Sequence, residues 1–348
     1  MKKNILIALA TIGVLTSCKN ETKESKNKEE PLKEVNVYTH RHYPTDQKLF
    51  AQFKKQTGIR VNVVNASADE LMQKMIQEGE QSPADVLITV DAGRLVNATD
   101  NNLLQPIFSE ILNTIIPEHL RAENGEWYGL TKRARVIAYA KDRVQPDELS
   151  TYENLANADW KGKILVRSSG NIYNQSLMAS IIANNGKEAA KAWAEKVVSN
   201  MARSPKGNDR DQVKAVVAGK GDIAIVNTYY IGKLLNSKDP VEVKAGERVG
   251  IFFPNQKGRG THINISGAGV AKYAPNKENA IAFIEFLASK EAQEVFAKAN
   301  YEYPVNPAVS ASPLLMSWGT FKEDSLSLSE LGKNNKSAVL LFDIVGWK

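Results

Sequence analysis

Cysteine and histidine are scarce in this sequence, and their scarcity excludes several classes of protein. Cys18 is the only cysteine among 348 residues, so no intramolecular disulfide and no cysteine-based metal site can form. The four histidines, at 40, 42, 119 and 262, include no pair with the spacing of helical metal ligands. A nucleophile elbow, a phosphate-binding loop and a zinc-protease helix motif are also missing. Without a catalytic constellation, we expect a protein that is not an enzyme.

Cofactor binding and nucleic-acid binding also find little support. The nearest match to a dinucleotide motif, Gly267-Ala268-Gly269, lacks the third glycine, and a tight turn entering a strand at Val270 explains it better. The formal net charge is only +6, and the basic residues are scattered along the chain. A nucleic-acid partner is therefore not expected.

Long apolar runs are confined to the N-terminus. Ile5–Leu15 is eleven residues long and follows two lysines, which is too short for a helix across a bilayer core of roughly 30 Å. This layout is typical of a signal peptide. Leu15-Thr16-Ser17-Cys18 resembles a bacterial lipobox, which implies a signal peptide over residues 1–17 and a lipidated Cys18. An ordinary signal peptide or a buried apolar start is the alternative.

A charged tether follows the lipobox. Ten of the sixteen residues from Lys19 to Glu34 are Lys or Glu, and such a segment buries too little apolar surface to fold. We therefore expect residues 18–34 to be a lipidated cysteine and a tether. The acyl chains would anchor the protein to a membrane without spanning it.

From Val35 onward, strands and helices alternate in two separate stretches. In the first, the apolar patterns predict strands and helices in turn over 35–38, 46–56, 59–64, 69–80 and 86–89. This order favours a parallel sheet with helices on both faces. The pattern resumes further along the chain. Strands are predicted over 164–166, 223–227 and 250–253 and at 270, and helices over 175–184, 187–200, 212–218, 277–288 and 291–299.

Two α/β units in one chain favour two lobes joined by crossing strands. The candidate crossings are residues 130–141 and 254–266. The first lobe would then be discontinuous, comprising 35–130 and 267–348. The second lobe would comprise 131–266, with the hinge strands at its ends.

Tyrosine is the residue type whose placement is informative. Tyr43, Tyr173 and the pair Tyr229-Tyr230 each follow a predicted strand, and open α/β sheets bind ligands at the carboxyl ends of strands. Phenolates suit a hard, highly charged cation. Because a phenol has a pKa of about 10, only a strongly charged ion displaces its proton at neutral pH. Each tyrosine alone is better explained as a packing residue, so the hypothesis of a ferric site depends on the four together, with His42 beside them.

These tyrosines lie in segments through which the chain resembles a known family. The resemblance is to the ferric-iron substrate-binding proteins of ABC transporters, close to FutA and FbpA, and it covers about residues 35–309. It is carried by Arg41-His42-Tyr43, Ser82-Pro83-Ala84-Asp85-Val86, Thr131-Lys132-Arg133-Ala134-Arg135-Val136, Asn171-Ile172-Tyr173-Asn174-Gln175-Ser176, Gly207-Asn208-Asp209-Arg210-Asp211-Gln212, Asn227-Thr228-Tyr229-Tyr230 and Tyr301-Glu302-Tyr303-Pro304-Val305-Asn306-Pro307.

The resemblance implies an α/β, two-lobed periplasmic-binding-protein fold of type II. Each lobe would have a mixed, mainly parallel sheet flanked by helices, and the lobes would close on iron. The ferric ligands it implies are His42 and Tyr43 from the first lobe and Tyr173, Tyr229 and Tyr230 from the second. Relatives without the histidine use an exogenous anion such as carbonate, so with His42 present we expect no obligatory anion.

Arg133 is the candidate for neutralising phenolate charge or contacting an anion. The alternative for Arg133 and Arg135, which share a strand face, is an ion pair between the lobes.

The resemblance also implies partners and a location. The protein would carry Fe(3+) as transported ligand to the permease and ATPase of an ABC importer. We expect a monomer on the periplasmic, extracytoplasmic side of a bacterial envelope, held there by its lipid anchor. One alternative is a binding protein of the same fold for a polyamine, thiamine or sulfate, which needs acidic or amide-rich cleft residues. A second alternative is an iron-dependent oxidase, which would need open coordination positions and a histidine–carboxylate triad. The sequence shows no such triad.

Overall fold

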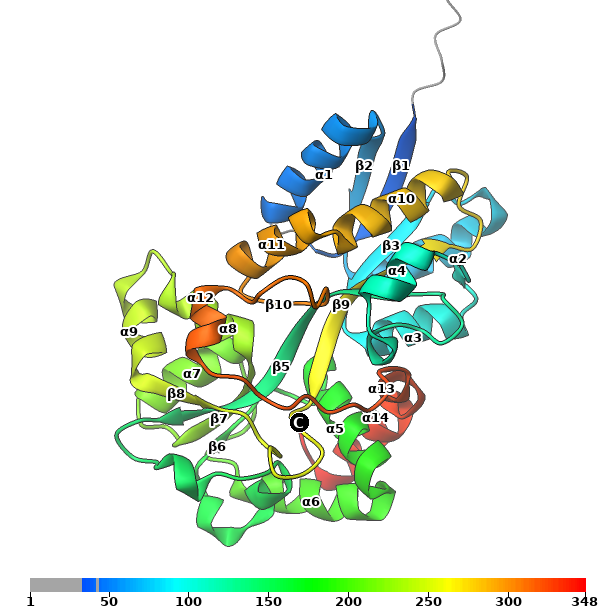
Figure 1. Ribbon diagram of the computed structural model, residues 1–348. Helices are drawn as coiled ribbons and strands as arrows, with labels where there is room; N and C mark the ends of the chain where they lie inside the picture. Colours follow the sequence, from blue (N-terminus) through cyan, green and yellow to red (C-terminus); the bar gives the residue numbers. More distant parts are fainter. Residues whose placement is uncertain (1–32, 42–43) are drawn as a thin grey trace, which may run out of the picture. The chain divides into compact units, whose positions relative to one another are not determined.

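The computed structural model describes residues 33–41 and 44–348 of the chain. The predicted signal peptide, Cys18, nearly all of the tether, His42 and Tyr43 therefore lie outside the described residues. No helix in the described part of the chain is both long enough and apolar enough to cross a membrane. The described part from Lys33 onward forms two lobes that share two long strands (Figure 1).

The first lobe is built on a mixed sheet. Strand β1 (Glu34–Thr39) lies parallel to β2 (Arg60–Asn65) and to β3 (Val86–Val90), as the sequence predicts. Next to β3 the sheet continues antiparallel, through β9 (Ile263–Ala271) and β5 (Tyr128–Ala140). Every residue of β3 is buried, which agrees with the continuous apolar runs of strands covered on both faces. Two short strands complete the sheet, β4 (Leu104–Gln105) on β9 and β10 (Tyr303–Pro304) on β5.

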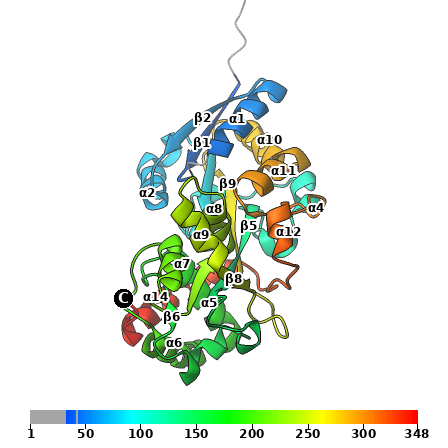
Figure 2. The ribbon, with the colours of Figure 1, turned by 90° about the vertical axis from the view of Figure 1, so that its left-hand side faces the viewer.

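Helices cover both faces of this sheet. On one side lie α1 (Pro44–Thr57), α10 (Lys277–Ala288) and α11 (Lys290–Ala299), and α2 (Ala68–Glu78) lies on the other (Figures 1 and 2). Rings of Phe53 and Phe283 meet edge to face at 5.1 Å between α1 and α10. Ile76 continues the apolar stripe of Leu71, Met72 and Met75 on α2, but its side chain is 44% exposed. The remaining elements are α3 (Ala92–Asp100), α4 (Glu110–Ile115) and the 3-10 turns η1 (Gly79–Gln81) and η2 (Glu118–Leu120).

The second lobe uses the other half of β5. There β5 pairs antiparallel with β7 (Ile223–Asn227) and β8 (Val249–Phe252), and β6 (Ile164–Leu165) extends the sheet parallel to β7. Helices lie on both sides of this sheet (Figure 1). They are α7 (Asp209–Val217), α8 (Thr228–Leu235) and α9 (Pro240–Arg248), and then α5 (Ile172–Asn185) and α6 (Lys187–Asn200). The 3-10 turns are η3 (Pro146–Glu148), η4 (Glu153–Ala156) and η5 (Ala158–Trp160).

One of the two crossing strands differs from the prediction. Strand β5 matches the predicted crossing over 130–141, but the second crossing is β9, which begins at Ile263 and not at 254. Gly267 and Gly269 lie inside this strand, and not in a turn before it. A Cβ on Gly267 would lie 2.7 Å from the backbone oxygen of Tyr128. The glycines therefore allow the two crossing strands to approach each other closely.

The C-terminal helices were not predicted, and they pack differently from the expected lobe division. They are α12 (Pro313–Ser317), α13 (Ser329–Lys333) and α14 (Asn335–Val345). The prediction placed all of 267–348 in the first lobe, but α14 contacts α5 and α6 of the second. The physical reason is an aromatic cluster. The ring centroid of Trp347 lies 4.9 Å from that of Phe342 and 6.1 Å from that of Trp193 in α6. The lobe boundaries near residues 130 and 267 stay a prediction.

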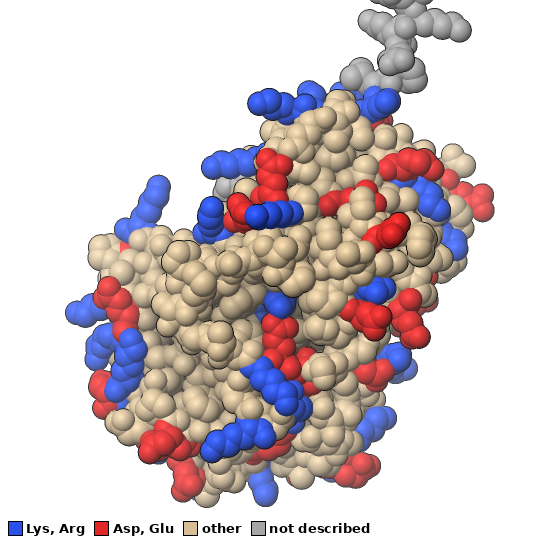
Figure 3. All heavy atoms as spheres, in the orientation of Figure 1, with Lys and Arg blue, Asp and Glu red and all other residues tan. Residues whose placement is uncertain are grey.

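Charges on the surface are mixed in sign. On the face shown in Figure 3, acidic and basic side chains are interspersed over both lobes. Many pair locally, as Arg143 does with Asp222 at 2.8 Å and Lys214 with Glu242 at 2.8 Å.

Candidate metal centre

Two helix N-termini bring three of the predicted tyrosines together. Helix α5 begins after Asn171, whose side chain accepts a hydrogen bond from the Tyr173 amide at 3.2 Å and so caps the helix. Helix α8 begins at Thr228, directly after β7. As a result, Tyr173 lies in the first turn of α5, and Tyr229 and Tyr230 lie in the first turn of α8. The Tyr229 hydroxyl donates to the Tyr173 hydroxyl at 3.1 Å.

The start of α8 decides how the adjacent tyrosines point. In a strand, Tyr229 and Tyr230 would face opposite sides. Because α8 starts at Thr228, the two rings lie on the same side, with centroids 4.3 Å apart and planes inclined by 32°. Burial, the Tyr173 phenol and the Asp209 carboxylate raise the pKa of Tyr230. Tyr230 is therefore a neutral phenol at neutral pH.

Three arginines surround the ring of Tyr173. The guanidinium carbons of Arg133, Arg135 and Arg167 lie 5.8, 5.9 and 5.6 Å from the ring centroid, within the usual range of a cation–π contact. Arg133 and Arg135 are buried on the crossing strand β5. A phenolate formed at Tyr173 would thus have positive charge close to it.

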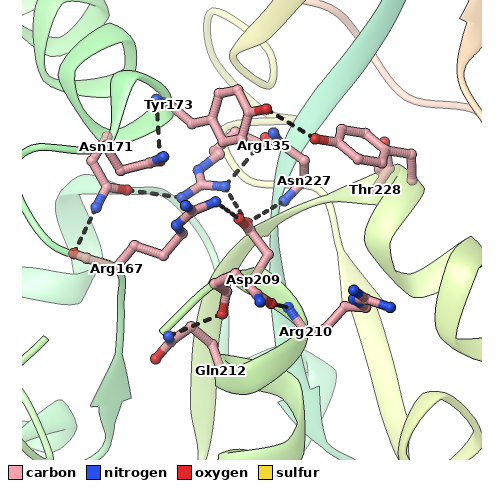
Figure 4. A network of polar contacts seen from close by, with 12 residues as sticks. Arg135, Arg167, Asn171, Tyr173, Asp209, Arg210, Gln212, Asn227 and Thr228 are labelled. Carbon is pink, nitrogen blue, oxygen red and sulfur yellow. Dashed lines mark hydrogen bonds and ion pairs between the residues drawn. The ribbon is translucent and has the colours of Figure 1, made fainter. Parts of the chain in front are cut away.

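One carboxylate holds two of these arginines in place. Asp209, fully buried at the start of α7, accepts from Arg135 at 2.5 Å and from Arg167 at 2.8 Å (Figure 4). Its Oδ1 also accepts from the backbone amide of Asn227 at 3.0 Å. Arg135 donates further to Asn174 at 2.8 Å. This network ties together the ends of β6 and β7 and the starts of α5 and α7. Tyr173 lies in the first turn of α5, and Tyr229 and Tyr230 follow directly after β7 in α8.

Arg133 occupies a different position. It donates to Ser266 at 3.2 Å and lies 4.0 Å from Glu302, a buried carboxylate between α11 and β10. Burial alone would lower the pKa of Arg133, but Glu302 and the phenols of Tyr173 and Tyr229 raise it overall. Its Nε and Nη2 atoms have no hydrogen-bond partner among the described residues. Both expectations for Arg133, as a neighbour of the phenols and as an ion-pair partner, remain compatible with this place.

Lys233 was missed by the sequence analysis. It lies on α8, and its ammonium is 5.2 Å from the Tyr229 ring centroid and 6.0 Å from that of Tyr230. Burial is the main cause that lowers its pKa. A helix beginning at 228 would have placed Lys233 one turn beyond the tyrosines. Arg167 and Asp209 were also missed, because only the fold brings them to Tyr173.

The first-lobe half of the predicted site, His42 and Tyr43, lies outside the described residues. The chain on either side is held: Arg41 donates to Asp46 at 3.0 Å, and Thr45 donates to the Asn300 side chain at 3.0 Å. Within residues 33–41 and 44–348, no three His, Cys, Asp or Glu side chains converge as a metal-binding group.

A narrow recess lies beside Tyr173. Its lining consists of Arg133, Arg135, Tyr173, Asn227, His262 and Asn264. The recess leaves no room for a water molecule. Burial and the neighbouring arginines lower the pKa of His262 to about 3, so this imidazole is neutral at physiological pH.

The fold and this site define an extracytoplasmic binding protein. Over residues 48–323 the chain matches the model of the bacterial extracellular solute-binding proteins, and it belongs to that family. Within the family it is 52% identical to "Iron uptake protein A1" of Synechocystis sp. over 315 residues, which are 90% of this chain and 88% of that protein. The predicted resemblance to ferric-iron-binding proteins is confirmed.

Solved structures agree with this assignment. The Trichodesmium protein described as "(IdiA) (FutA) in complex with iron and citrate ligands" has a TM-score of 0.89 and 53% identity, covering 90% of this chain and 100% of that one. "Ferric binding protein from Campylobacter jejuni" has a TM-score of 0.85 and 45% identity, with coverages of 90% and 100%. The predicted two-lobed periplasmic-binding-protein fold is confirmed by these matches.

Proposed function

We propose that this chain is the extracytoplasmic substrate-binding component of an ABC-type iron importer and binds Fe(3+) between its lobes. The ligands are the phenolates of Tyr173, Tyr229 and Tyr230, joined by His42 and Tyr43 from the first lobe. The observation that carries the proposal is the convergence of three phenols from two helix N-termini. The relatives named for iron uptake and ferric binding support it.

The spacing of the phenols suits a small, hard cation. The hydroxyl oxygens of Tyr229 and Tyr173 are 3.1 Å apart. Oxygen ligands at about 2.0–2.1 Å from an octahedral ion lie about 2.9 Å from their nearest neighbours on the same ion. A cation between these two oxygens would therefore need only a small movement of the side chains, accompanied by loss of both protons.

The surrounding charges support phenolate over phenol once iron is bound. Four phenolates and a neutral imidazole leave Fe(3+) with a net charge of −1. Arg133 and Lys233 lie beside the rings and offset that charge. Ferrous iron gains less from phenolate ligands, so the site favours the ferric ion.

No exogenous anion is obligatory in this proposal. Two nitrogens of Arg133 lack a partner among the described residues, and they would suit carbonate. The recess beside them, however, is too narrow for a water molecule. An anion would enter only after the side chains move, whereas His42 supplies a fifth ligand from the chain itself.

The alternative ligands fit the described site less well. A polyamine requires carboxylates, yet Asp209 is already engaged by two arginines and Glu302 lies against Arg133. The proposal also takes the protein to be a carrier without enzyme activity, as the names of its relatives suggest.

The proposed partners follow from this role. The loaded protein delivers iron to a permease driven by an ATPase, acts as a monomer, and is held at the periplasmic face by a lipid on Cys18. The described residues contain no membrane-spanning helix, and Cys18 lies outside them.

Titration with ferric iron tests the proposal. The purified protein should develop a visible phenolate-to-iron charge-transfer band that saturates at one iron per chain. Gallium, which is trivalent but not reducible, should compete for the same site. A colourless mixture, with iron fully retained by a weak chelator such as citrate, would contradict the assignment.

A further inference from the structure

The segment Asn300–Glu302, between α11 and β10, contacts Thr45 of the first lobe as well as residues beside the tyrosines of the second. The Asn300 side chain accepts from Thr45, two residues after the predicted ligand Tyr43. Glu302 lies 4.0 Å from Arg133. Between them, Tyr301 packs directly on Gly232 of α8, the helix that carries Tyr229 and Tyr230. This segment of the first lobe therefore lies against the iron-binding helix of the second.

The contact leaves no room for a side chain at residue 232. A Cβ built on Gly232 would lie 2.6 Å from both the Cβ and the Cγ of Tyr301. Ordinary contact begins at about 3.4 Å, so the Cβ of an alanine at residue 232 would lie about 0.8 Å too close to these two atoms of Tyr301. The obstructing atoms sit at the base of the tyrosine and cannot swing away. Glycine inside a helix is unfavourable, and this close approach explains its presence.

Tyr301 is also held in an unusual backbone conformation. Its φ is +57°, and the only other non-glycine residues of the described chain with positive φ are Asp91, Asn102 and Asn255. Aspartate and asparagine adopt this region much more readily than tyrosine does. An aromatic residue keeps such a conformation only where the surrounding structure holds it there. For Tyr301, the packing on Gly232 of α8 is the contact associated with this conformation.

We propose that Tyr301 is a positioning residue of the iron site, which seats on Gly232 and sets how closely α8 approaches the first lobe. The inference rests on the proposed function. Ligands from two lobes bind one ion well only if both sets are placed within about 0.5 Å of their bonding positions. A displacement of about 0.8 Å at Gly232 exceeds this tolerance. It would keep the first-lobe ligands from reaching an ion held by the tyrosines of the second.

Gly232→Ala is the direct test. The variant should bind ferric iron at least tenfold more weakly in competition with citrate. It should lose iron faster and show a shifted charge-transfer band. In the double variant with Tyr301→Gly, both obstructing atoms are gone and glycine accepts the positive φ. Binding should then be tighter than in Gly232→Ala alone, a rescue that a purely structural defect would not show.

Two controls separate positioning from stability. Gly221→Ala is a matched change just before β7, at the end of that strand away from α8, where a Cβ would lie 2.8 Å from the backbone oxygen of Lys163. It should lower thermal stability without moving the band or the affinity. Tyr301→Phe keeps the ring on Gly232 and should bind iron like the wild type.

The outcomes are distinct from those of the proposed function. If the wild type gives no band with ferric iron, the function and this inference both fail. If the wild type binds and Gly232→Ala binds equally well, or the double variant shows no rescue, only the inference is overturned. Should Gly232→Ala not fold, Tyr301→Gly compared with Tyr301→Phe examines the same contact. A tenfold loss in the first alone supports the inference, and equal binding by both overturns it.

Discussion

Removal of one phenol hydroxyl from the adjacent pair should weaken ferric binding far more than it disturbs the fold. Tyr229→Phe and Tyr230→Phe keep the ring packing, whose centroids lie 4.3 Å apart. Tyr229→Phe loses the hydrogen bond to the Tyr173 hydroxyl, which is worth about 0.5–1.5 kcal/mol of stability. The unfolding temperature should therefore change little in either variant.

The expected loss of affinity follows from the cost of ionising the phenol. Deprotonating a group with a pKa of about 10 at pH 7 costs about 4 kcal/mol, and the cost is larger at Tyr230, whose pKa is raised mainly by burial. A phenolate serves as a ligand only if its bond to iron exceeds this cost. We expect each variant to bind iron well over tenfold more weakly, a loss above about 1.4 kcal/mol.

The pH dependence gives the sharpest measurement. Each phenol releases one proton when it binds iron, so below the phenol pKa the affinity rises about tenfold per pH unit for every such ligand. Competition titrations against citrate from pH 6 to pH 8 should show that each variant loses one proton from the slope of the wild type. Its charge-transfer band should also shift.

Tyr303→Phe is the matched control. Tyr303 is 8% exposed, and its hydroxyl is buried without a hydrogen-bond partner among the described residues. Its removal should leave the iron affinity unchanged and the stability equal or slightly higher. Wild-type affinity, slope and spectrum in both pair variants would show that Tyr229 and Tyr230 are packing residues and would refute the ligand assignment.

Three further predictions concern anchoring, closure and acid stability. Cys18→Ala should still bind iron but leave the membrane fraction or remain unprocessed; a processed variant that stays in the detergent phase would disprove lipidation. Ferric iron should reduce the radius of gyration in small-angle scattering, because ligands from both lobes meet only in the closed state. Closure requires that the contacts between the lobes differ between the apo and the iron-loaded protein. Identical contacts between the lobes under all conditions would contradict it. Burial opposes ionisation of Glu153, but hydrogen bonds from Asn255 and Arg259 lower its pKa to about 2. Its contribution to stability is therefore present above pH 4.3, the usual pKa, and is lost toward pH 2. Glu153→Gln should lower the unfolding temperature at pH 7 and flatten its fall in acid, and an unchanged acid profile would argue against it.

Local patterns were sufficient where one strand or helix buries one face. The period-two and helical patterns predicted β1, α1, β2, α2 and β3 in order, and the parallel pairing of β1 with β2 and β3 is confirmed. The exposed Ile76 shows the limit of such patterns. An apolar side chain can continue a helical stripe and still lie beyond the edge of the sheet that covers it.

Patterns failed where a distant segment decides the outcome. The glycines of β9 have the composition of a turn, but their lack of side chains is what lets β5 and β9 approach each other. The helix α14 carries an apolar stripe that could cover either lobe. Its place beside α6 depends on the cluster of Phe342, Trp347 and Trp193, which no local pattern contains.

The site divides along the same line. The sequence by itself determined which residue types could hold a hard cation and placed Tyr173, Tyr229 and Tyr230 after strands, because strand ends and helix starts follow from local periodicity. Only the tertiary structure decided that α8 begins early enough to turn both tyrosines of the pair to one side. It also decided that Asp209 holds two arginines near Tyr173, and that Tyr301 rests on Gly232. These contacts join residues far apart in the chain, and their distances depend on the packing of whole helices and strands, which local sequence preferences do not specify.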